Sequence, residues 1–229
     1  MRRYHSVRRA LGRVALVRIG YSLLNAMWQA ACDNKRRSRA SLNAAFEKTA
    51  DPWNFASPLG TRRHAAVLAY LERFCPRTAD ILEVGCAEGM FTERLATHCR
   101  SLLAVDTSPV ALERARGRCP WGEHVQFAQW DLRTDPTPGI FDAVIAMDVL
   151  EYIQAPNSLR TARHKLVHSL RPGGWLFVTS TRQEAESEWW SRYLLRGRWI
   201  NGFVSRHSHL KCISETLDEG FVASVFLRK

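Results

Sequence analysis

The segment DILEVGCAEGMFTERL, residues 80–95, carries the clearest structural signal in this chain of 229 residues. Its apolar start predicts a strand over residues 81–84, and the small residues that follow predict a tight turn. The next residues predict a helix over 90–98. A turn without bulky side chains lets a ligand lie against backbone N–H groups at the start of a helix. The segment therefore predicts the first part of a ligand-binding β–α–β unit.

A second acidic position extends this pattern. The run LLAVD predicts the next strand and ends at Asp106. An acidic residue at about this spacing accepts hydrogen bonds from ribose hydroxyls in nucleotide-binding β–α–β units. The alternative role for Asp106 is to cap the helix that follows the turn Thr107-Ser108-Pro109.

The turn itself restricts the choice of ligand. A dinucleotide fingerprint requires G-x-G-x-x-G, whereas this turn has Gly85, Ala87 and, at the last required position, Met90. Glu83 stands just before the first glycine, where its carboxylate would repel a phosphate and attract a cationic amine or sulfonium. The turn therefore disfavours a pyrophosphate and favours a positively charged ligand.

Short apolar runs alternate with helical patterns along the rest of the chain. Further strands are expected at residues 102–105, 125–128, 143–147 and 175–180, and further helices at 41–50, 62–74, 110–116 and 158–169. Two last strands, 210–217 and 221–227, flank a glycine-containing turn and predict an antiparallel hairpin. The chain is therefore expected to form an α/β fold, a Rossmann-like doubly wound sheet of seven mostly parallel strands with a C-terminal antiparallel hairpin.

Positive charge is concentrated at the N-terminus. The formal net charge is +11, but residues 1–63 hold 13 Lys/Arg against 3 Asp/Glu, so the rest of the chain is close to neutral. A nucleic-acid enzyme would more naturally carry positive charge along its cleft, so no nucleic-acid partner is expected. The apolar stretch 11–31 is interrupted by Arg13 and Arg18 and is too polar for a spanning helix.

Residues 1–45 are expected to form a basic helical N-terminal extension with one apolar face and one arginine-rich face. Three interpretations stay open for it. The helix packs on the following domain or caps its cleft, it contacts a membrane surface or another anionic partner, or it is a disordered basic tail.

The six cysteines are scattered, without CxxC or Cys/His metal spacing. They are interpreted as reduced thiols of a cytoplasmic protein, and no metal site is expected.

The glycine turn with Glu83 before it and Asp106 after it resembles the class I S-adenosylmethionine (SAM) dependent methyltransferases, whose first motif is acidic-x-G-x-G/A-x-G. The segment DPWNF at residues 51–55, followed by LEVGCAEGMFTERLA, LLAVDTSPVALERAR and MDVLEYI, narrows this resemblance to the nodulation S type. The likeness covers about residues 45–229, so a methyltransferase domain is expected at 46–229. The chain departs from the family in residues 57–61 and in its long basic N-terminus.

The resemblance implies a set of cofactor residues. Asp106 would hold the ribose, Asp131 would receive the adenine amino group, and Trp53 would cover the methionine end beside Arg62 or Arg63. The alternatives are a loop carboxylate for Asp131 and a hydrophobic staple for Trp53. The full expected set is Trp53, Arg62, Glu83, Gly85, Cys86, Ala87, Gly89, Asp106, Thr107, Asp131, Leu132 and Met147.

The resemblance also points to the place of methyl transfer, which is an in-line displacement that depends mainly on alignment of the reactants. Ligands bind outside the carboxyl ends of parallel strands, so Asp148, Glu151 and Tyr152 are candidates for this region. Asp148 has helix capping as an alternative. His207 or His209 could serve as a base, since imidazole titrates near working pH, or could be solvated loop histidines.

These observations favour a SAM-dependent methyltransferase that yields S-adenosylhomocysteine and methylates nitrogen or oxygen of a small or medium-sized metabolite, with sugar-derived compounds as one option. The alternatives are an RNA or protein methyltransferase that uses the basic N-terminus, and a non-catalytic SAM-binding, membrane-associated partner protein. The oligomeric state is expected to be monomer or homodimer.

Overall fold

The structure is a computed structural model that describes residues 39–119, 122–153, 156–182 and 197–229. Residues Arg37–Lys229 form one compact unit, so the helix that begins at Arg39 belongs to this unit. The expected extension helix before it lies outside the described residues. No described helix has the length and apolar character needed to cross a membrane.

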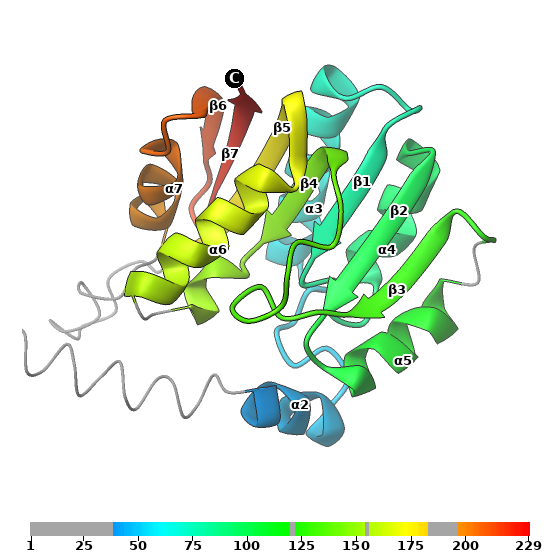
Figure 1. The fold of residues 1–229 in the computed structure, drawn as a ribbon. Coiled ribbons are helices and arrows are strands. Elements are labelled where there is room, and N and C mark those ends of the chain that lie inside the picture. The colour runs from blue at the N-terminus through cyan, green and yellow to red at the C-terminus, as the bar shows by residue number, and fades with distance from the viewer. Residues whose placement is uncertain (1–38, 120–121, 154–155, 183–196) are drawn as a thin grey trace, which may run out of the picture. The chain divides into compact units, whose positions relative to one another are not determined.

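Seven strands form one sheet, as the sequence predicts (Figure 1). The strands are β1 Asp80–Val84, β2 Ser101–Asp106, β3 Val125–Gln129, β4 Phe141–Met147, β5 Leu170–Thr181, β6 Leu210–Leu217 and β7 Phe221–Arg228. Their order across the sheet is β3-β2-β1-β4-β5-β7-β6, and β7 runs antiparallel to both of its neighbours. The predicted Rossmann-like sheet with a terminal hairpin is therefore confirmed.

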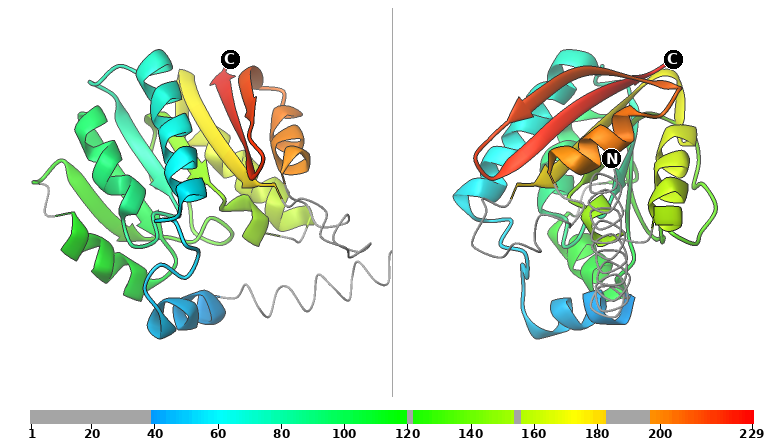
Figure 2. Two further views of the ribbon diagram at one scale, coloured as in Figure 1. Left: turned by 180° about the vertical axis from the view of Figure 1, so that it is seen from behind. Right: turned by 90° about the vertical axis from the view of Figure 1, so that its left-hand side faces the viewer.

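Helices cover both faces of this sheet (Figure 2). They are α2 Arg39–Lys48, α3 Pro58–Phe74, α4 Met90–Leu95, α5 Pro109–Arg118, α6 Pro156–His168 and α7 Arg198–Ser205, with short 3-10 turns η1 Ala96–His98 and η2 Leu150–Tyr152. α3 begins four residues before the predicted start, because Ser57 accepts a hydrogen bond from Gly60 N–H and Pro58 suits the first turn. The sequence patterns did not predict α7 or η2.

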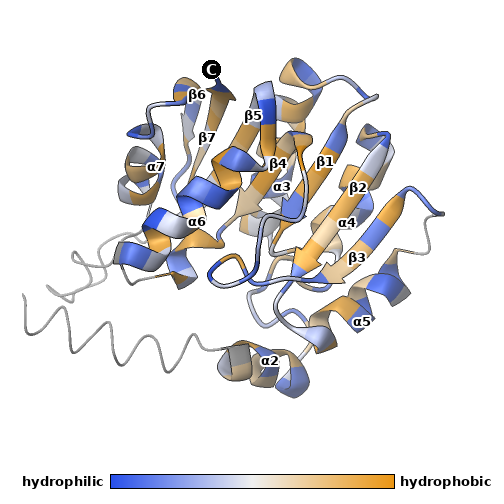
Figure 3. Cartoon of the chain, viewed as in Figure 1, coloured by the Kyte–Doolittle hydropathy of each residue, from blue (hydrophilic) through white to orange (hydrophobic). Residues whose placement is uncertain are grey.

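The core is divided between the two faces because side chains alternate along each strand. Ile81 packs with Phe91 and Leu95 on the face covered by α3 and α4. Its neighbour Leu82 points the opposite way and packs with Leu166 under α6. The central strands β1 and β4 carry long apolar runs, as expected for parallel strands buried on both faces, whereas the edge strands β3 and β6 are partly polar and exposed (Figure 3).

Candidate cofactor and methyl-transfer site

The glycine turn is fixed to the adjacent strand. The N–H groups of Gly85 and Cys86 both donate to the carbonyl of Val105, at 2.8 and 3.0 Å. Gly85 has a φ of 77°, and a Cβ there would lie 2.4 Å from a methyl group of Val149. Only glycine fits this position without strain, so the turn keeps its backbone open toward the carboxyl edge of the sheet.

Asp106 holds the other side of the turn. Its carboxylate accepts hydrogen bonds from Ala87 N–H at 3.0 Å and from Ser108 N–H at 2.9 Å. The residue that caps α5 is Ser108, whose hydroxyl accepts from Ala111 N–H. Burial raises the pKa of Asp106. A carboxylate offers about four acceptor positions, so Asp106 can accept from a ligand as well as from these backbone groups.

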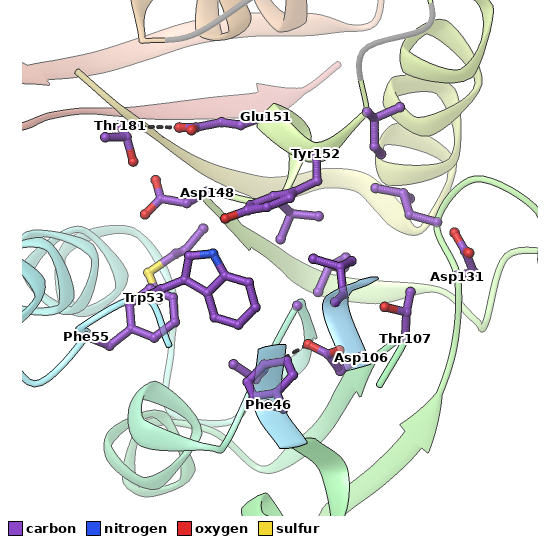
Figure 4. A pocket seen from close by; sticks show the side chains of 18 of the residues that line it. Phe46, Trp53, Phe55, Asp106, Thr107, Asp131, Asp148, Glu151, Tyr152 and Thr181 are labelled. Carbon is purple, nitrogen blue, oxygen red and sulfur yellow. Dashed lines mark hydrogen bonds between the residues drawn. The ribbon is translucent and has the colours of Figure 1, made fainter. Parts of the chain in front are cut away.

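A cavity of about 350 Å³ opens at the carboxyl edge of β1, β2, β4 and β5, and is called the crevice below. Its volume falls within the range of small-molecule sites. Eight predicted cofactor residues line it, namely Trp53, Gly85, Ala87, Asp106, Thr107, Asp131, Leu132 and Met147. Trp53 lies on one side, and Asp106, Thr107 and Asp131 lie on the other (Figure 4).

Four other predicted cofactor residues do not line the crevice. Glu83 and Cys86 border a smaller void beside it, and Gly89 is the N-cap of α4, where a Cβ would lie 3.1 Å from Ala115. Arg62 lies on the surface and pairs with Asp218 at 3.3 Å. The expectation that these four residues bind the cofactor is therefore corrected, because neighbouring residues of a strand or helix point in different directions and these four do not face the crevice.

Glu83 is buried and accepts a hydrogen bond from the Thr92 hydroxyl at 2.7 Å. Burial raises its pKa from 4.5 to about 7. Its direct contact is therefore with α4, and the bond ties the end of β1 to the helix that follows the turn.

Arg63, rather than Arg62, faces the crevice. Its guanidinium forms a buried ion pair with Asp148, which also accepts a hydrogen bond from the Thr179 hydroxyl at 3.0 Å. The Nε atom of Arg63 is buried without a hydrogen-bond partner. Asp148 has a left-handed backbone, with φ 54°, and the short η2 turn begins after Val149, so Asp148 caps no helix. The pair places a donor-rich cation at the end of β4.

Aromatic rings form one wall of the crevice. Trp53 packs against Phe46 of α2, with ring centroids 4.8 Å apart, and meets Tyr152 edge to face at 6.0 Å. Phe46 comes from outside the recognised motifs, and no sequence signal marked it as a lining residue. Trp130 also borders the crevice, but most of its side chain is buried in the core, where its ring N–H donates to the carbonyl of Pro136 at 2.7 Å.

Acidic side chains stand at the two ends of the crevice. Asp131 is buried and pairs with Arg133 at 2.7 Å. At the other end, Glu151 is buried and accepts a hydrogen bond from Thr181 N–H. Thr181 ends β5, so the rule that ligands bind at carboxyl ends of strands could have identified it.

The structure places His207 and His209 away from the crevice, and the prediction of a base role there is wrong. β6 runs parallel to β5, so the residues just before β6 lie near the start of β5, at the opposite edge of the sheet. There their rings lie 5.4 Å apart and contact His168 of α6, which stacks on His164. The described residues include no group of three or more His, Cys, Asp or Glu arranged to hold a metal ion.

Solved structures share this architecture. The crystal structure of the N-methyltransferase NodS from Bradyrhizobium japonicum WM9, in complex with S-adenosyl-L-homocysteine, is 28% identical with a TM-score of 0.70. The match covers 81% of this chain and 97% of that one. The strand order and this likeness place the chain in the class of proteins with the Rossmann-like SAM-dependent methyltransferase fold.

Sequence comparison gives the family. The family model of nodulation protein S (NodS) matches residues 37–195, and the chain belongs to that family. Nodulation protein S of Sinorhizobium fredii (strain NBRC 101917 / NGR234) is 38% identical over 57% of this chain and 60% of the relative. The ubiquinone biosynthesis O-methyltransferase of Xylella fastidiosa (strain 9a5c) is 30% identical over 64% and 60%. The chain thus spans about 60% of the length of these relatives.

Proposed function

We propose that this protein binds SAM in the crevice and transfers its methyl group to a nitrogen or oxygen of a small or medium-sized metabolite. The observation that carries the proposal is that the open glycine turn and the carboxylate of Asp106, joined by a hydrogen bond, lie together at the rim of a cavity of about 350 Å³. The S-adenosylhomocysteine complex of the Bradyrhizobium relative supports the choice of cofactor.

The crevice residues suit the parts of this cofactor. The carboxylate of Asp106 would accept hydrogen bonds from the ribose hydroxyls. Asp131 and Leu132 would receive the adenine, with Thr107 beside them. Arg63 lies at the aromatic end of the crevice with an unpartnered buried Nε, and suits the carboxylate of the methionine part. Trp53 would cover this end.

Bound SAM supplies a methyl group already activated by its sulfonium, so the chain mainly has to align an acceptor with it. Asp148, Glu151 and Tyr152 line the part of the crevice beyond the ends of β4 and β5. A buried carboxylate there would orient an amine or hydroxyl and could accept its proton. The names of the two relatives, one an N-methyltransferase and one an O-methyltransferase, support both acceptor atoms.

The decisive experiment has two stages. Calorimetry should first show that the full chain binds S-adenosylhomocysteine with one site. The protein is then incubated with methyl-labelled SAM and two metabolite panels, one of amines that includes amino sugars and one of phenols and alcohols. Label in a small product supports the proposal and names the acceptor atom. Binding without any labelled product in either panel would contradict the enzymatic part.

A further inference from the structure

Glu88 stands in the glycine turn, yet its side chain faces away from the crevice into the smaller void beside it. The residue is 4% exposed, and a glutamate is rarely buried so far unless its carboxylate is paired. Its carboxylate accepts a hydrogen bond from Asp51 N–H at 2.7 Å and pairs with Arg114 of α5 at 2.5 Å. One buried carboxylate therefore joins the turn to a loop 37 residues earlier in the chain.

The same contacts hold the whole loop at residues 49–56, called the cover loop below. Arg114 also donates to the carbonyl of Thr49 at 3.1 Å. The Asp51 carboxylate in turn accepts hydrogen bonds from Phe55 N–H at 2.7 Å and Ala56 N–H at 2.9 Å. Asp51 itself has φ 48°, a left-handed backbone that Asp adopts more often than most other non-glycine residues. Fixing Asp51 therefore fixes the loop from end to end.

The cover loop carries the aromatic wall of the crevice. Both Trp53 and Phe55 line the cavity, and Trp53 contacts Tyr152 across it. Glu88 lies one residue from Ala87, whose N–H is bound to Asp106. The two sides of the proposed cofactor site, the glycine turn below and the cover loop above, are thus joined through one side chain that does not line the crevice.

We propose that Glu88 is a positioning residue that couples binding of the cofactor at the glycine turn to closure of the cover loop. The proposal rests on the proposed function. A buried carboxylate holds its place only while charged and hydrogen-bonded partners satisfy it, so the Asp51 amide and Arg114 must stay in position together. Without the carboxylate, the cover loop loses its link to the turn, and Trp53 no longer has a fixed place over the ligand.

The test is Glu88→Gln in the full chain, with Glu72→Gln as the matched control. Glu72 has a largely exposed side chain and pairs with His98 outside the site. Trypsin cleavage of the bond after Lys48, at the start of the cover loop, is followed by mass spectrometry with and without saturating S-adenosylhomocysteine. We expect ligand to slow this cleavage in the wild type and the control. In Glu88→Gln, cleavage should be about tenfold faster without ligand, and saturating ligand should no longer suppress it.

Ligand affinity measured by calorimetry should also fall about tenfold in Glu88→Gln only. Equal cleavage rates and equal affinity in the wild type and Glu88→Gln would overturn the proposal. Should Glu88→Gln fail to fold, Arg114→Gln removes the other half of the pair from a more exposed position, and unchanged cleavage there overturns it equally. If the wild type binds no S-adenosylhomocysteine, the proposed function fails, while the cleavage rates without ligand still test the link between Glu88 and the loop.

Discussion

The two edges of the sheet hold their ionisable side chains in different ways. At the carboxyl edge, charged groups from distant segments are buried and paired, as with Arg63 and Asp148 or Glu88 and Arg114. At the opposite edge, the arginines of the ion pairs Arg100–Asp80 and Arg171–Asp142 are exposed, and histidines pack against one another, with His168 and His164 stacked at a centroid distance of 3.7 Å. Burying a charge is costly unless it is paired. The buried ion pairs named above lie at the edge where the crevice opens.

Two histidines of the opposite edge, His164 and His207, have lowered pKa values. Partial burial, followed by the nearby Arg163 and neighbouring imidazoles, lowers the pKa of His207. Burial and then His168 lower the pKa of His164. These histidines pack against one another at the edge opposite the crevice, and none of them lines the crevice. The comparison predicts that substitutions at the two edges differ in their effects on stability and on ligand binding.

The largest effect is expected from Asp148→Ala, which leaves Arg63 buried without its partner. Breaking a buried ion pair by removing one member costs about 3–5 kcal/mol of stability. Urea unfolding should therefore show a much lower midpoint than the wild type. Arg62→Ala is the control, since it breaks only the exposed pair with Asp218 and should change stability by less than about 1 kcal/mol. Equal losses in both variants would remove the distinction between buried and exposed pairs.

The next effect depends on pH and concerns Glu83. Its pKa is about 7 in the folded protein against an ordinary value of 4.5, because burial disfavours the charged form. Between these values the unfolded chain releases the proton and the folded chain keeps it, so the free energy of unfolding falls as pH rises through this window. The loss is about 3 kcal/mol and is complete above pH 7.

Glu83→Gln should remove this dependence. Thermal unfolding should give similar midpoints for the variant and the wild type near pH 4, and a higher midpoint for the variant at pH 8. Glu72→Gln, at a largely exposed side chain, should follow the wild type at both values. Parallel curves for Glu83→Gln and the wild type would show that the buried carboxylate does not titrate in this range.

Asp106→Ala should act on the ligand more than on the fold. The substitution removes the acceptor expected for the ribose hydroxyls and weakens S-adenosylhomocysteine binding by about 2 kcal/mol, the scale of hydrogen bonds to a charged group. Calorimetry measures this directly, and circular dichroism checks that the variant folds. Arg62→Ala, outside the crevice, should bind the ligand as the wild type does. Unchanged affinity in Asp106→Ala would rule out its assigned role.

The sequence predicted the sheet well because its strands are short apolar runs, and it located the carboxyl edge through Gly85 and Asp106. It could not separate Arg62 from Arg63, since both lie in the first turns of a helix whose start was misplaced. It also gave no sign of the bond between Glu88 and Asp51. Such a contact joins segments that are far apart in the chain, and local sequence patterns do not predict which distant segments pack together.

His207 and His209 were misplaced for a different reason. Their residue type suited a base, but only the direction of β6 decides at which edge they stand, and an antiparallel pair can be added to a sheet in either order. Once β7 lies antiparallel between β5 and β6, the start of β6 and the residues just before it must lie at the edge opposite the crevice. Chemistry alone was therefore a poor guide to position.

The smallest effect is expected from replacing His207 and His209 together with glutamine. Because both lie at the edge opposite the crevice, the variant should keep the wild-type affinity for S-adenosylhomocysteine and the wild-type rate of methyl transfer at every pH between 6 and 8, and its stability should change by about 0.5 kcal/mol or less. Calorimetry and the label-transfer assay with the identified acceptor measure both properties. Tyr152→Phe, inside the crevice, provides the contrast and should lower the transfer rate. A loss of turnover in the histidine variant with unchanged ligand binding would mean that the opposite edge takes part in the reaction, and the contrast between the two edges would fail.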